Sequence, residues 1–80
     1  MPADAKRQIE PLCEALLHYV AWHPDAADGL AGIRQWWLPE TLRDVPLALV
    51  REAVEALVAS GEMHRSVLPD GTELFAREGR

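Results

Sequence analysis

The sequence has few cationic residues, a single cysteine and no long apolar run. Its 80 residues carry 8 Lys and Arg against 13 Asp and Glu, a formal net charge of -5. This acidic balance disfavours non-specific attraction to nucleic acid or anionic lipid.

Because Cys13 is the one cysteine, no internal disulfide can form, which suits a reducing cytoplasm. No stretch has the apolar region of a signal peptide or the length of a membrane span. We therefore expect a cytoplasmic protein without a membrane segment, and the start at Met1 with short tails favours a free-standing chain.

Motifs for catalysis and metal binding are also missing. There is no glycine-rich phosphate loop, no nucleophile elbow and no paired carboxylates beside an apolar stretch. Cys13 and His18 do not converge on one face of a helix, and His18, His23 and His64 lack the spacing of metal ligands. We expect no enzyme activity, no cofactor and no metal, and we expect Cys13 to be a small core residue.

Hydrophobic periodicity predicts three helices after a flexible polar tail over residues 1–8. The helices are expected over residues 9–22, 27–37 and 46–59. Pro11 is expected in the first turn of the first helix, where its missing N–H costs little. The apolar residues expected to face the core are Leu12, Cys13, Leu16, Tyr19, Val20, Leu30, Ile33, Trp37, Leu47, Val50, Ala53, Val54, Leu57 and Val58.

Capping residues define the ends of these helices. The His23–Pro24 pair should end the first helix, because a residue before proline is pushed out of the α region. Asp25 or Asp28 is the expected N-cap of the second helix, and Asp44 is that of the third. Gly61 should end the third helix in a left-handed conformation.

After Gly61 the period changes to that of a β-hairpin over residues 62–77. Pro-Asp-Gly at residues 69–71 suits a type I turn followed by a glycine bulge. The buried face of the hairpin is ambiguous. We favour Met63, Val67 and Phe75 facing inward, with Leu74 partly covered.

The stretch VREAVEALVASGEM, which starts at Val50, carries a valine, an alanine–aliphatic pair, a leucine, a glycine and an aliphatic residue. It resembles the third helix and wing of bacterial winged helix-turn-helix regulators. The resemblance covers residues 27–77, and the first helix matches by position only. It implies a mainly α, α+β fold, with three helices and a C-terminal hairpin wing, in a single domain over residues 9–78. In that family the third helix enters the major groove of DNA and the wing touches the backbone.

The exposed face of the third helix is poorly suited to DNA. It offers Arg51 beside Glu52 and Glu55, and the two glutamates would face a polyanion. The wing adds Arg65 and Arg77. If the chain binds DNA, we expect Arg51, Arg65 and Arg77 to make the contacts; otherwise these cations are solubilising surface charges.

Two adjacent tryptophans, Trp36 and Trp37, stand in the sequence QWWLPE. Neighbouring helix positions point about 100° apart, so both rings cannot face one narrow apolar stripe. Trp37 continues the apolar spacing of the second helix and is expected in the core. Trp36 lies on the side of two glycines. Its ring either tucks against the first helix or the tail, near Trp22, or is an exposed anchor for a partner.

The sequence therefore favours protein–protein interaction or self-association. The expected interaction residues are Trp36, Trp22 and Leu49, which all lie at the edges of apolar stripes. The expected partner is another protein or a second copy of the chain. The alternative is a DNA-binding transcriptional regulator that uses the helix at 46–59 and the wing at 62–77.

Overall fold

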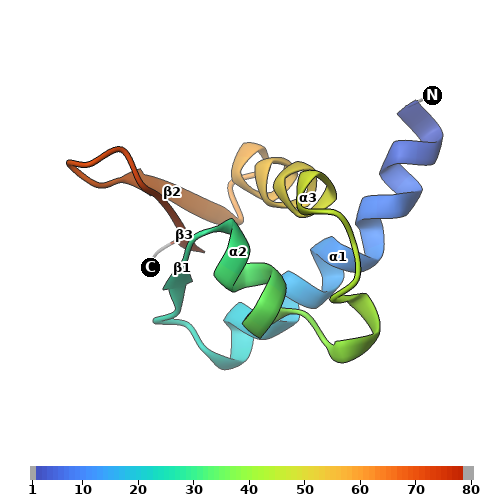
Figure 1. Cartoon of the computed structure of the whole chain (residues 1–80), viewed down its shortest axis with the longest axis horizontal. Helices are drawn as coiled ribbons and strands as arrows, with labels where there is room; N and C mark the ends of the chain where they lie inside the picture. Colours follow the sequence, from blue (N-terminus) through green and yellow to red (C-terminus); the bar gives the residue numbers. More distant parts are fainter. Residues whose placement is uncertain (1, 79–80) are drawn as a thin grey trace.

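The computed structural model describes residues 2–78, and the side chains of residues 9–78. This part of the chain is a mainly helical α+β fold, with three helices and a three-stranded antiparallel sheet (Figure 1). In chain order the elements are α1 (Pro2–Trp22), β1 (Ala27–Asp28), α2 (Leu30–Gly32) continued by the π-helical turn η1 (Ile33–Trp37), the 3-10 turn η2 (Glu40–Leu42), α3 (Leu47–Ala59), β2 (Met63–Val67) and β3 (Glu73–Arg77). The hairpin of β2 and β3 and the start of α1 project at opposite ends of the long axis.

Helix α1 begins earlier than expected. It starts at Pro2, so residues 2–8, expected as a loose tail, are helical, while Met1 lies outside the described residues. The alanines, lysine, arginine and glutamine of this stretch are good helix formers and extend the helix. Pro11 consequently lies inside the helix rather than in its first turn, where it removes one backbone hydrogen bond. The helix ends at Trp22, as expected from the proline two residues on.

The second helix starts later than expected and changes its hydrogen-bonding period. It begins at Leu30, with Gly29 at the N-cap position and no side-chain cap, so the predicted caps Asp25 and Asp28 are wrong. The Asp28 carboxylate instead accepts the N–H of Gly29 at 2.9 Å and lies over Gly32. From Ile33 to Trp37 the backbone forms a single π turn.

Helix α3 matches its predicted range closely, but its first cap does not. Pro46 rather than Asp44 occupies the N-cap position, and its carbonyl accepts the N–H groups of Leu49 and Val50. At the other end, Gly61 has φ 87°, as predicted. The N–H of Gly61 donates to the Val58 carbonyl, and the N–H of Glu62 donates to that of Leu57. This pair of bonds is a Schellman motif, which turns the chain out of α3.

The hairpin forms as its turn residues predicted. Gly71 has φ 92°, and its N–H donates to the Leu68 carbonyl at 2.8 Å, while the Leu68 N–H donates to the Thr72 carbonyl. The strand order is β1-β3-β2. The short strand β1 was not predicted. It pairs with β3 through Ala27–Ala76 and Asp28–Phe75, and so joins the segment before α2 to the hairpin.

The core lies where α1, the π turn, α3 and the base of the hairpin meet. Its buried residues are Leu12, Leu16, Val20, Ile33, Trp37, Leu38, Val50, Ala53, Val54, Leu57, Met63 and Phe75. Most were predicted, but Leu38 was not, and Val67 and Leu47 are exposed instead of inward. Val67 shares a face with Met63 yet stands beyond the end of the helices, and Leu47 occupies the first turn of α3. No helix in the described chain is both long and apolar enough to cross a membrane.

The close approach of Asp28 to Gly32 generates a stability prediction. A Cβ at Gly32 would collide with the Asp28 carboxylate, whereas at Gly29 it would meet only ordinary contact with the Glu73 carbonyl. In the Asp28→Ala background, Gly32→Ala should stabilise the domain by about 0.5–1 kcal/mol through helix propensity. In the wild type that gain should be lost or reversed. Urea unfolding of the four variants of this cycle measures the coupling; additive effects would mean that the carboxylate does not restrict Gly32.

Candidate functional site

Aromatic side chains line a groove between α1 and the segment that follows the π turn. Its walls carry His18 and Tyr19 from α1 and Trp36 from η1. Its other lining residues are Ala15, Trp37, Leu38 and Pro39, and its volume is about 330 Å³. We call this feature the aromatic groove. No Asp, Glu, Lys or Arg lines it, so an apolar group can enter without displacing a charge.

The two adjacent tryptophans have opposite environments. Trp37 is buried and stacks on Tyr19, with ring centroids 5.0 Å apart and an interplanar angle of 12°. Trp36 is 64% exposed. Successive positions of a helical turn point to different faces, so burial of Trp37 leaves the Trp36 ring directed outward. The core role predicted for Trp37 is confirmed, and the alternative of a tucked Trp36 ring is wrong.

Trp22 extends the aromatic surface along α1. Its ring is 72% exposed, and its centroid lies 6.3 Å from that of His18 one turn earlier. Trp22 therefore borders the aromatic groove through His18. Leu49, the third residue predicted for interaction, is half buried against the core and does not line the groove. The structure brings Trp36 and Trp22 to one surface but leaves Leu49 apart from it.

The cations predicted for DNA contact fall into two places. Arg51 of α3 and Arg65 of β2 both approach Glu73 of β3, at 3.7 and 3.6 Å, and Arg51 also pairs with Glu55 at 3.3 Å. Each arginine is about half exposed, so each pair contributes at most about 1 kcal/mol to stability. Their main effect is to place a carboxylate against both guanidinium groups.

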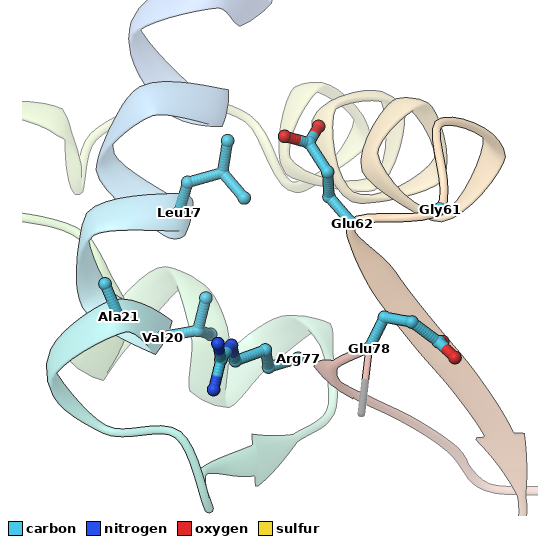
Figure 2. A pocket seen from close by; sticks show the side chains of 7 residues that line it. All are labelled: Leu17, Val20, Ala21, Gly61, Glu62, Arg77 and Glu78. Carbon is cyan, nitrogen blue, oxygen red and sulfur yellow. The ribbon is translucent and has the colours of Figure 1, made fainter. Parts of the chain in front are cut away.

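Arg77 lies away from that cluster, against α1. It lines a separate hollow of about 340 Å³ together with Leu17, Val20 and Ala21 of α1 and with Gly61, Glu62 and Glu78 (Figure 2). Figure 2 shows its guanidinium directed toward the α1 side, while the Glu78 carboxylate points away from it. Glu78 instead approaches His64 at 3.5 Å. The three predicted DNA contacts therefore do not form one surface.

Cys13 is packed between helices rather than presented for chemistry. Its thiol donates to the Ala53 carbonyl at 3.7 Å. Burial raises the pKa of this thiol, and the nearby negative charge of Glu62 raises it further, which disfavours the reactive thiolate. Among the described residues, no three His, Cys, Asp or Glu side chains gather as metal ligands would.

The chain matches no protein-family model, no curated protein and no solved structure.

Sequence reasoning missed several residues of these sites. His18 and Tyr19 line the aromatic groove, yet Tyr19 was predicted only as a core residue and His18 was not predicted as part of an interaction surface. The His18–Trp22 spacing of one helical turn was the available signal. Glu73 had no local signal, because its contacts with Arg51 and Arg65 come from other elements.

The contrast between the two tryptophans generates a second stability prediction. Trp37→Ala should lower the free energy of unfolding by about 3–5 kcal/mol, since it empties a buried, stacked position. Trp36→Ala should lower it by less than about 1 kcal/mol, because its ring is mostly in water. Urea denaturation followed by circular dichroism measures both. Equal losses would show that Trp36 is part of the core.

Proposed function

We propose that this chain is a non-catalytic winged-helix module that mediates protein–protein interaction or self-association through the aromatic groove. The observation that carries the proposal is the exposure of Trp36 at the wall of that groove. Trp22, on the same surface, enlarges the apolar area available to a partner.

The winged-helix assignment is supported by the order of elements. A short strand between the first two helices pairs with the second strand of a C-terminal hairpin, and the third helix directly precedes that hairpin. The left-handed glycine at Gly61 and the buried face of α3 also fit the stretch on which the resemblance rests. A fold alone assigns no activity, so the proposed function rests on the side chains at the surface.

Exposed tryptophan is the strongest argument for an interaction role. A large indole left in water forgoes the free energy of burial, and tryptophan is enriched among residues that dominate binding. The Trp36 ring stands beside a groove whose lining carries no charged Asp, Glu, Lys or Arg. Its backbone also belongs to a π turn, a feature that is frequent at functional sites.

The alternative, a DNA-binding regulator, lacks a comparable surface. Arg51 and Arg65 face carboxylates of the same chain, and Arg77 lies against α1. The remaining exposed face of α3 carries Glu52 and Glu55. With a formal net charge of -5, the chain supplies little of the electrostatic attraction on which DNA binding depends.

A single thiol and the lack of a catalytic motif fit a non-catalytic protein of the reducing cytoplasm.

Self-association is tested by sedimentation velocity over a range of concentrations. The wild type should form a dimer as concentration rises, and Trp36→Ala should weaken it at least about tenfold, the loss expected for a hot-spot residue. The matched control is Val67→Ala, because Val67 is 60% exposed but lies on the hairpin. Equal weakening by both variants would contradict a specific role for the groove.

A different partner is tested by site-specific photo-crosslinking in cells. A benzophenone side chain at position 36 should give a discrete adduct that the same group at position 67 does not.

The DNA-binding alternative is tested by NMR. Short duplex DNA at low salt should leave the amide NMR signals of α3 and the hairpin unmoved. Salt-sensitive shifts at Arg51, Arg65 and Arg77 would favour the DNA-binding alternative instead.

A further inference from the structure

The seam between α3 and the hairpin holds one carboxylate between two guanidinium groups. Oε1 of Glu73 lies 3.7 Å from Nη1 of Arg51, and Oε2 lies 3.6 Å from Nη1 of Arg65. The two oxygens of one carboxylate are thus shared between a helix and a neighbouring strand. This is the arrangement of an oxyanion site, because guanidinium groups recognise carboxylate and phosphate with the same donors.

Register explains why the three side chains converge. Glu73 is paired with Val67, two residues from Arg65, and Arg65 is paired with Phe75. Glu73, Arg65 and Phe75 therefore share the hairpin face whose buried members, Met63 and Phe75, belong to the core. The Glu73 side chain is 33% exposed, so its carboxylate is held near the surface beside α3 rather than deep in the core.

Open space adjoins each of the two arginines, and one of the two hollows also borders Glu73. A hollow of about 400 Å³ is lined by Arg51, Thr72, Glu73 and Phe75 together with residues 28–32, which include the acidic Asp28. A second, of about 250 Å³, is lined by Arg65, Phe75 and three residues of α3, including Glu55. An external phosphate can therefore approach either arginine, but it must compete with Glu73 and, at Arg51, with Glu55.

We propose that Arg51 and Arg65 form an oxyanion site that the chain fills with its own Glu73, and that this occupation excludes the phosphates of nucleic acid from the α3–hairpin seam. The four ion-paired groups of the seam, Arg51, Arg65, Glu55 and Glu73, carry charges that sum to zero, and Asp28 adds a negative charge at the hollow beside Arg51. Removing the Glu73 charge leaves Arg51, Arg65 and Glu55 with a net positive charge and takes the carboxylate away from Arg65, while Arg51 still pairs with Glu55. Glu73 is thus a specificity-determining residue, and its role does not depend on the aromatic groove.

The test measures binding of a fluorescein-labelled short DNA duplex at low salt by anisotropy. Glu73→Gln is compared with Glu78→Gln, a matched control on the same segment whose carboxylate approaches His64 instead of the arginines. Both variants change the formal net charge of -5 by the same one unit. Glu73→Gln should bind at least about tenfold more tightly than Glu78→Gln or the wild type, since it releases two partly exposed ion pairs. In the double variant Glu73→Gln with Arg65→Gln, this gain in DNA affinity should be lost.

Three outcomes would overturn the proposal. Equal binding by the two glutamine variants would mean that net charge alone matters. A gain that survives Arg65→Gln would place the site elsewhere, and wild-type binding as tight as that of Glu73→Gln would mean that Glu73 excludes nothing. Should Glu73→Gln fail to fold, Glu73→Thr removes the same charge with a residue favoured in strands. None of these results bears on association through Trp36, which the sedimentation experiment tests separately.

Discussion

The stack of Trp37 on Tyr19 is the contact on which the arrangement of the surface depends. It joins the π turn to α1 with parallel rings, and it fixes the direction in which the preceding residue leaves the turn. Once Trp37 is buried, Trp36 must point elsewhere, because successive residues cannot share one face of a helix. The groove, its apolar floor and its exposed indole are therefore consequences of how one ring enters the core. A domain of this size has a thin core, so a buried tryptophan contributes an unusually large share of it.

Features set by neighbouring residues were predictable from the sequence. The buried stripe of α3, the left-handed Gly61 and the glycine bulge at Gly71 all follow from patterns within a few positions. Features set by distant contacts were not. The strand β1 has two residues and exists because β3 lies beside it, and Val67 is exposed because the helices end before they reach it. The first helix begins at Pro2, because the helix propensity of the polar residues before Pro11 extends it toward the N-terminus. Pro11 was therefore misinterpreted as marking the start of the helix.

The same distinction between local patterns and distant contacts applies to the candidate sites. Helical spacing sufficed to separate Trp37 from Trp36, but it could not decide whether α1 covers Trp36. The acidic outer face of the third helix was predictable from Glu52 and Glu55, which are both exposed. The pairing of Arg51 and Arg65 with Glu73 required the register of the hairpin against α3. The chemical character of each side chain could be predicted from its residue type. Which side chains lie close together depended on the packing of elements that are far apart in the sequence.

The sheet ends in a strand whose outer edge is open to backbone pairing. Within the described residues, β2 pairs only with β3, so one row of its backbone N–H and C=O groups faces outward. Such an edge invites strand-to-strand pairing and fibre growth unless charge or shortness prevents it. Here the strand spans Met63–Val67 and carries His64 and Arg65 near its centre, and in an antiparallel pairing centred on Arg65 two like charges would oppose each other. Charge on a short edge strand therefore opposes open-ended strand-to-strand pairing along β2.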